Sequence, residues 1–273
     1  MNPLDNIPLW LLMIVATLSQ VFFIEAGFRY GRTRKGPAKK AQMAQVRAIM
    51  GASLGLLAFM LAFSFSIAQQ HFEVRTGAYM MEVSAIDSAF RGADLLPEDD
   101  RTEAKELLIE FTKLRVELAA TASDAKIESV IEMIRESERM HDHLWSIAER
   151  SMEGSGSGES TGIFAGAVLA MINAHDARLQ AALFNRIPPV IWLTLFLMSL
   201  LAMVVMGFQA GLTGTRSGLA TWTLAITFSA VMMLVTDLDR TKMTLFRINQ
   251  DLMLELENRM VERVTEVPAY LQQ

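Results

Sequence analysis

The sequence contains no cysteine, which excludes disulfide bonds and any chemistry that depends on a thiolate. It also lacks the Gly-x-Ser-x-Gly, His-Glu-x-x-His and glycine-rich phosphate-binding motifs that mark common classes of enzyme. We therefore expect neither an enzyme nor a bound cofactor. The single basic cluster lies between two apolar runs, so we expect no nucleic-acid partner either.

The chain is instead rich in long apolar runs. Hydrophobic residues make up 52% of its 273 residues and charged residues 20%. Four runs, at residues 7–28, 48–70, 190–211 and 217–236, are long enough as helices to cross the ~30 Å core of a bilayer. The composition predicts an all-α membrane protein with four transmembrane helices and a substantial water-exposed part.

The second run organises the rest of the chain. Residues 48–70 are uncharged and pass into a polar helical pattern with no proline between the two, which predicts one continuous helix. Phe59 and Phe63 lie one turn apart beside a narrow stripe of small and polar residues, formed by Gly51, Gly55, Ala58, Ala62, Ser66 and Gln69. Such a stripe allows another helix to approach closely. One interpretation is that the stripe packs against another helix of the same subunit. The other is that it lines a subunit interface or a pore, in which the phenylalanines form a constriction.

The charge pattern predicts an orientation. The loop at residues 29–47 carries seven basic residues and no acidic one. By the positive-inside rule it lies in the cytoplasm, so the segment after the second span and both chain termini lie outside the inner membrane. Residues 69–187 have the opposite balance, with 21 acidic and 12 basic residues and a net charge of −9.

Residues 69–187 have a helical pattern of apolar residues throughout and predict a four-helix bundle inserted between the second and third spans. A new helix is expected after Pro97, another after an N-cap at Ser123, and a flexible linker at residues 154–162. The expected domains are residues 1–68 (spans one and two), 69–187 (the bundle), 188–238 (spans three and four) and 239–273. The last is a polar tail with an amphipathic helix, whose apolar stripe comprises Leu252, Leu256, Met260 and Val264.

No metal site is expected from the histidines or the acidic clusters. His141 and His143 point to opposite sides of one helix, so we expect His141 in the bundle and His143 at its surface. His175 is expected to be a hydrogen-bonded core residue, and His71 to lie at the membrane exit, with a pH-sensitive gate as the less favoured alternative. The acids at residues 98–100 are explained by a helix start rather than by a calcium loop.

Charged residues end the fourth span. Asp237, Asp239 and Arg240 are interpreted either as a hydrated stop signal or as a polar lock between the spans and the tail. Arg186 and Arg75 are the candidate partners in such a lock.

Several motifs resemble a family of bacterial membrane proteins of unknown function that are described as bestrophin-like. The matching stretches lie between Ala48 and Gln250: GLLAFMLAFSFSIA (55–68), ADLLPEDDR (93–101), NRIPPVIW (185–192), DLDR (237–240) and LFRINQ (245–250). Thr241 stands where relatives tend to have proline.

This resemblance implies kinship to bestrophins, which are pentameric anion channels with a hydrophobic neck on the second span and a cytoplasmic domain. The neck would correspond to Phe59 and Phe63, whereas the basic loop here places the domain outside. The first hypothesis is therefore a homo-oligomeric ion channel in the lipid bilayer, with anions favoured by the resemblance. The alternative is a non-conducting membrane sensor or scaffold whose acidic bundle binds a ligand or partner protein.

Overall fold

Helices account for every regular element in the computed structural model, which describes residues 7–34, 40–121, 127–153, 158–214, 217–240 and 251–265. In chain order they are α1 (Leu9–Thr33), α2 (Lys40–Gly92), the short 3-10 helix η2 (Ala93–Leu95), α3 (Glu98–Thr121), α4 (Ile127–Glu153), α5 (Gly158–Phe184), α6 (Pro189–Thr213), α7 (Gly218–Asp239) and α8 (Asp251–Thr265). Four of these helices, α1, α2, α6 and α7, are long and apolar enough to cross a membrane.

The chain divides into two compact units. The first comprises Met1–Glu73 and Asn185–Phe246, and the second Val74–Phe184 and Arg247–Gln273. Helix α2 supplies residues to both, because its 53 residues form one helix of about 80 Å at 1.5 Å per residue. The continuous second helix predicted from the sequence is confirmed.

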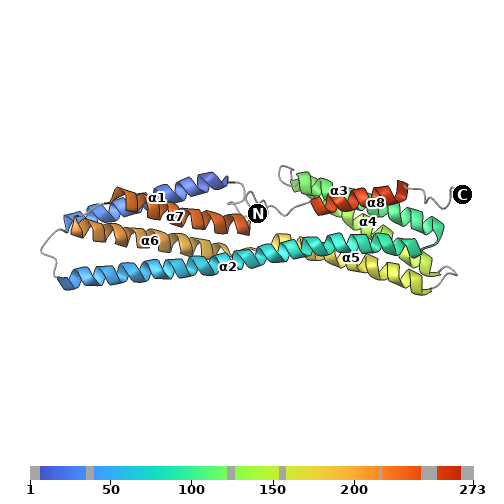
Figure 1. Ribbon diagram of the computed structural model, residues 1–273, viewed down its shortest axis with the longest axis horizontal. Helices are drawn as coiled ribbons and strands as arrows, with labels where there is room; N and C mark the ends of the chain where they lie inside the picture. The colour runs from blue at the N-terminus through green and yellow to red at the C-terminus, as the bar shows by residue number, and fades with distance from the viewer. Residues whose placement is uncertain are drawn as a thin grey trace. The chain divides into compact units, whose positions relative to one another are not determined.

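The first unit is held together by an unusually close approach of α1 and α6. Gly27 and Gly31 of α1 face Gly207 and Gly211 of α6 so closely that a Cβ at any of them would overlap a backbone carbonyl of the other helix. Helix α7 also packs on α1, and the three helices lie side by side in Figure 1. Because lipid supplies no hydrophobic drive between helices, backbone contact of this kind is what holds apolar helices together in a membrane.

Helix α2 joins this unit through its larger side chains. Leu57 and Leu61 are buried against Leu195 and Ala202 of α6 and Met232 of α7. A second cluster contains Ala68 with Ile187, Val235 and Leu238. The small residues of α2 therefore lie on the face that the other helices of the protomer leave uncovered.

The second unit is a helical bundle around one apolar core. Tyr79, Ile86 and Phe90 of α2 pack with Leu108 and Phe111 of α3, and α4 and α5 add further core residues: Leu144, Ile147, Phe164, Val168 and Met171. Helix α3 begins where the sequence predicts, directly after Pro97, with Glu98, Asp99 and Asp100 in its first turn. These acids stabilise the positive end of the helix dipole.

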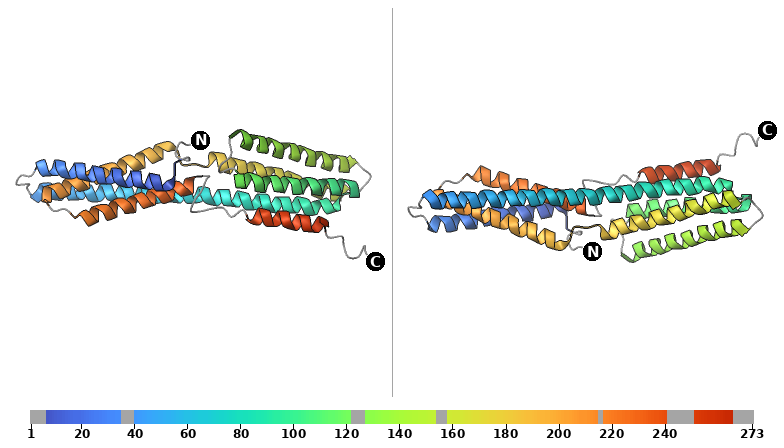
Figure 2. Two further views of the ribbon diagram at one scale, coloured as in Figure 1. Left: turned by 90° about the horizontal axis from the view of Figure 1, so that it is seen from above. Right: turned by 90° about the horizontal axis from the view of Figure 1, so that it is seen from below.

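Helix α8 packs into this bundle beside α3 (Figure 1), and it also borders α2, next to which it lies in both views of Figure 2. Its buried residues are Met253, Leu256 and Met260, whereas Leu252 and Val264 are exposed. The predicted stripe was therefore partly wrong. The residues that contact the core are Met253, Leu256 and Met260, which are spaced by three and then four residues.

Two predicted features around the bundle have different outcomes. The N-cap at Ser123 lies outside the described residues, as do residues 154–157 of the predicted linker. The rest of that linker was predicted wrongly, because α5 already begins at Gly158. Glu159 in its first turn favours a helix start, and Thr161 is buried against the bundle.

Candidate functional site

The exposed face of α2 is the first candidate site. Gly51, Gly55, Ala58, Ala62, Ser66 and Gln69 are all exposed. A Cβ at Gly51 or Gly55 would meet nothing within 4 Å. Within the protomer, the close contact between helices that small residues allow is made by α1 and α6. The stripe on α2 has no neighbouring helix in the described protomer.

Phe59 and Phe63 lie beside this stripe and are among the most exposed large apolar residues of α2, with 62% and 57% of their surface accessible. Their neighbours on the opposite face, Leu57 and Leu61, are buried. Helix α2 thus has two different apolar faces, one packed against its own protomer and one open. The open face combines small residues, which permit close approach, with two aromatic rings one turn apart.

A polar junction occupies the end of α7 in the first unit. The Oδ1 of Asp239 accepts a hydrogen bond from the backbone N–H of Ile187 at 2.8 Å, and His71 Nδ1 lies 3.9 Å from the same oxygen. Arg240 Nη1 donates to the carbonyl of Ile7 at 2.8 Å. Asp237, Asp239 and Arg240 are all buried, so they are not simply hydrated residues that end a span.

This junction joins four places in the sequence: the residues before α1, the middle of α2, the link between α5 and α6, and the end of α7. Arg186, one of the two predicted partners, is half-buried. It immediately precedes Ile187, whose backbone N–H donates the hydrogen bond to Asp239. His71 belongs to the same group, and the sequence had placed it only at the membrane exit.

A buried ionic cluster lies in the core of the second unit and was not predicted. Glu82 of α2 is fully buried, and its carboxylate meets Arg115 of α3 and Arg178 of α5, with Arg115 Nε at 3.1 Å. His175 Nδ1 of α5 donates to Glu82 at 3.1 Å. Burial alone would raise the pKa of Glu82, but the hydrogen bond from His175 and the two guanidinium groups together lower it to about 2.

Two histidines complete this ionic cluster. The rings of His141 and His175 meet edge to face, with centroids 4.8 Å apart, and both contact Phe111. Burial lowers the pKa of His141 to about 4, and the nearby His175 adds to this shift. The predictions that His141 lies in the bundle and that His175 is a hydrogen-bonded core histidine are confirmed. The ionic cluster could have been predicted from the sequence only by noticing that Glu82, Arg115 and Arg178 occupy inward-facing positions of their helices.

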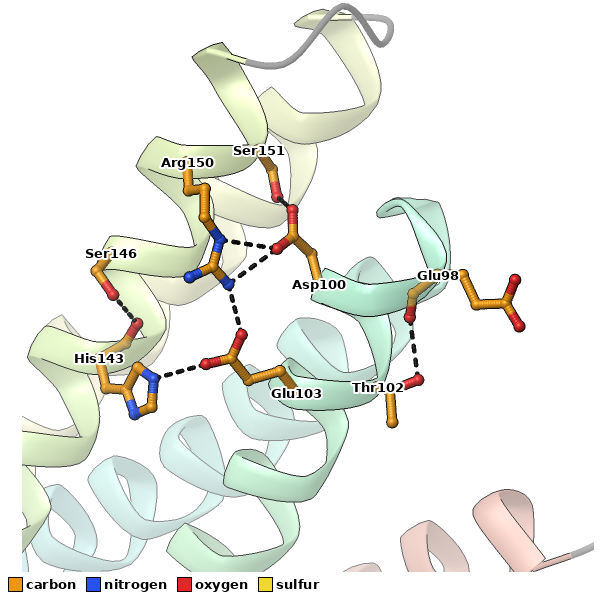
Figure 3. A network of polar contacts seen from close by, with 8 residues as sticks. All are labelled: Glu98, Asp100, Thr102, Glu103, His143, Ser146, Arg150 and Ser151. Atoms are coloured by element: carbon orange, nitrogen blue, oxygen red, sulfur yellow. Dashed lines mark hydrogen bonds and ion pairs between the residues drawn. The ribbon is translucent and has the colours of Figure 1, made fainter.

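A second ionic group, at the surface, joins α3 to α4 (Figure 3). Asp100 accepts from Ser151 and from Arg150, whose guanidinium also meets Glu103. His143 Nε2 donates to Glu103 at 2.8 Å, which agrees with the predicted surface position of His143. Hydrogen bonds from Ser151 to Asp100 and from His143 to Glu103 lower the pKa of each carboxyl group. Asp100 therefore holds two helices together besides starting one.

No metal site is found among the described residues, where no three His, Asp or Glu side chains are arranged to hold an ion. His141 and His143 do not share a site, since the first is buried beside His175 and the second is exposed beside Glu103. The arrangement of the described residues thus offers an open apolar face, a polar junction and a buried ionic cluster.

Comparison with known proteins links this arrangement to one family. Residues 16–241 match the family model described as the Bestrophin-like domain. A point variant of a bacterial bestrophin homologue from Klebsiella pneumoniae is 14% identical, with a TM-score of 0.64 over 94% of this chain and 99% of that one. A point variant described only as a membrane protein is 15% identical, with a TM-score of 0.65 over 96% of this chain and 100% of that one. No sequence among curated proteins matches the chain.

Proposed function

The chain belongs to the Bestrophin-like domain family, and from this premise we propose that it forms a homo-oligomeric ion channel in the membrane. In this proposal α2 of each copy faces a shared pore, and Phe59 and Phe63 form its constriction. Anions are the proposed ions, and five copies the proposed number, by kinship with bestrophins.

The observation that carries the proposal is the open face of α2. Its small residues have no partner helix in the described protomer, although α2 packs firmly on α6 and α7 through Leu57 and Leu61. An apolar helix with one packed face and one uncovered small-residue face suits contact with further copies around a symmetry axis.

The two phenylalanines suit a constriction on physical grounds. A ring of benzyl groups contributed by several copies narrows a water-filled path and disfavours water inside it, which is how hydrophobic gates hold back ions. Ser66 and Gln69 on the same stripe add polar groups toward the end of the span that precedes the second unit. Ions that pass the rings would meet these side chains next.

The decisive experiment is ion flux through liposomes that contain the purified protein. We expect Phe59→Ala and Phe63→Ala to raise flux or weaken its selectivity, because each opens the constriction. Phe22→Ala is the matched control, because Phe22 is equally exposed but lies on α1. Bilayers that remain sealed with both the wild type and Phe63→Ala would reject the channel and favour the non-conducting sensor or scaffold.

Assembly through the α2 face can be tested separately from conduction. We expect Gly55→Leu to disrupt or change the oligomer, because the bulky side chain stands where a neighbouring copy approaches. Leu193→Ala serves as the control, since Leu193 is an exposed apolar residue on α6. Mass measurement of the detergent-solubilised protein distinguishes the outcomes, and an unchanged mass for Gly55→Leu would contradict the proposed interface.

We further propose that the second unit is an extracytoplasmic bundle inserted between the second and third spans, with the basic loop in the cytoplasm. The seven basic residues at 29–47 and the net charge of −9 over residues 69–187 support this orientation. Reporter fusions at Lys39 and within residues 154–157 test it. Cytoplasmic activity of the second fusion would show that the topology is the reverse of the proposed one and agrees with the arrangement of bestrophins.

The polar junction is proposed to act as a lock on this fold. Asp239 and Arg240 connect the end of α7 to Ile187 and Ile7 through hydrogen bonds. The loss of one of these bonds is expected to alter gating rather than to abolish assembly. Flux measurements on Asp239→Asn, with oligomer mass as the control, test this role.

A further inference from the structure

A cavity of about 30 Å³ lies where α2 and α8 meet in the second unit. It is lined by Asp87, Phe90 and Arg91 from α2 and by Arg259, Met260 and Arg263 from α8. Phe90 and Met260 are buried and provide its apolar wall. The remaining four lining residues are charged, so a small cavity in the bundle surface is bordered mainly by charged side chains.

The charge around this cavity is strongly positive. Three guanidinium groups face one carboxylate, and Arg91 Nε already pairs with Asp87 at 2.9 Å. Arg259 and Arg263 form no hydrogen bond or ion pair with any other residue that the structure describes. Residues 69–187, which include Arg91, carry a net charge of −9, and α8 has four acidic residues against its two arginines, so this cluster of positive charge stands out within an acidic unit.

Helix stability alone does not explain these arginines. Arg263 lies in the last turn of α8, where a cation stabilises the negative end of the helix dipole. Arg259 lies one turn earlier, outside the range of that effect. Both lie beyond residues 16–241, so the match to the family model does not extend to these two arginines.

We propose that the cavity between α2 and α8 binds a phosphate group. Guanidinium groups present paired N–H donors that match the oxygens of a phosphate, and such charge-assisted hydrogen bonds are stronger than neutral ones. A cavity of this size holds one or two water-sized groups, so it can receive one or two oxygens of a phosphate, whose remaining oxygens stay at the bundle surface, and it is too small for a nucleoside. The bound group joins α2 to α8 and so holds α8 in the bundle.

The same chemistry has two possible sources, free phosphate and the headgroup of a phospholipid. Titration calorimetry of the full-length protein in detergent distinguishes them, using inorganic phosphate in one arm and soluble short-chain phosphatidic acid in the other. Saturable heat in either arm supports the site and identifies the source. Sodium chloride at matched ionic strength is expected to give no saturable heat.

Variants connect the binding to the cavity. We expect Arg259→Gln combined with Arg263→Gln to weaken binding at least tenfold, and the corresponding lysine variants to weaken it less because they keep the charge. Arg139→Gln is the matched control, since Arg139 is exposed on α4 and pairs with Glu132 and Glu136. Absence of saturable binding in both arms, or undiminished binding in the double glutamine variant, overturns the proposal. Because the measurement involves no ion flux, it is independent of the channel proposal.

Discussion

His175 Nδ1 donates a hydrogen bond to Glu82 Oε1 at 3.1 Å, and both side chains are almost completely buried in the second unit. This contact joins α5 to α2, and Arg115 and Arg178 bind the same carboxylate. A buried carboxylate with three partners from two other helices fixes how those helices pack. Its removal should cost far more than the loss of one hydrogen bond.

Glu82→Gln is predicted to destabilise the second unit by about 3–5 kcal/mol, because it leaves the buried Arg115 without its counter-charge. Chemical denaturation of the detergent-solubilised protein, followed by circular dichroism, measures the loss. Glu98→Gln is the control, because Glu98 is exposed at the start of α3 and should change stability by less than about 1 kcal/mol. Equal effects of the two substitutions would show that the Glu82 cluster contributes little.

Stability is predicted to fall as the pH drops from about 6.5 to about 4 because of His141. Burial lowers the pKa of folded His141 from 6.5 to about 4, so in this window the unfolded chain binds a proton that the folded chain does not. The contribution of His141 to the free energy of unfolding is complete above pH 6.5 and amounts to about 3 kcal/mol, which is lost by pH 4. The low pKa of Glu82, about 2, adds a second loss that begins only below about pH 4.5.

Denaturation midpoints measured between pH 4 and pH 8 test this dependence. His141→Phe should flatten the curve above pH 4.5, because it removes the titrating group and keeps a ring against Phe111. His143→Gln should leave the slope in place, since His143 lies at the surface. A slope that survives in His141→Phe would assign the proton uptake to another group.

Two glycine positions should respond differently to alanine. In Gly207→Ala the new methyl group would overlap the carbonyl oxygen of Ile24 on α1, so the helices must separate. The cost is expected to be at least about 1–3 kcal/mol, as for other overpacked positions. In Gly51→Ala the methyl group meets nothing within 4 Å, so the protomer should be unchanged or slightly stabilised by the better helix propensity of alanine.

Thermal unfolding of the detergent-solubilised variants measures this difference. We expect a lower midpoint for Gly207→Ala and an unchanged or slightly higher midpoint for Gly51→Ala. Equal midpoints would mean that the contact between α1 and α6 is not as close as described.

Tyr79→Phe is predicted to loosen α8. The Tyr79 hydroxyl accepts a hydrogen bond from the backbone N–H of Met253 at 3.1 Å, in the first turn of α8, where amide groups lack partners within the helix. Loss of this acceptor should cost about 1 kcal/mol. Hydrogen exchange should therefore become several-fold faster in α8, whereas Tyr30→Phe on α1 should not affect it. An unchanged exchange rate in α8 would show that this hydrogen bond does not contribute to holding it.

Much of the fold follows from the sequence because apolar runs and breaks are local signals. The uncharged stretch at 48–70 predicts a helix long and apolar enough to span a bilayer, and Pro188 and Pro189 predict the end of α5 and the start of α6. The structure has these helices and these breaks. His141 and His175 were placed in the core by the helical spacing of their neighbours alone. Each of these predictions depends on residues within a few turns of one another.

The sequence by itself determined that this is a membrane protein whose described residues are helical and include four helices long and apolar enough to span a bilayer, because run length and polarity decide where a helix can meet lipid. Only the tertiary structure decided which glycines make the close contact, because the stripes at Gly27 and Gly51 look alike until α6 is seen to cover one and leave the other open. It also decided that Glu82, Arg115 and His175 meet, and that the arginines of α8 face α2. Such meetings depend on how distant helices rotate and dock, which is set by the packing of whole faces and not by any local pattern.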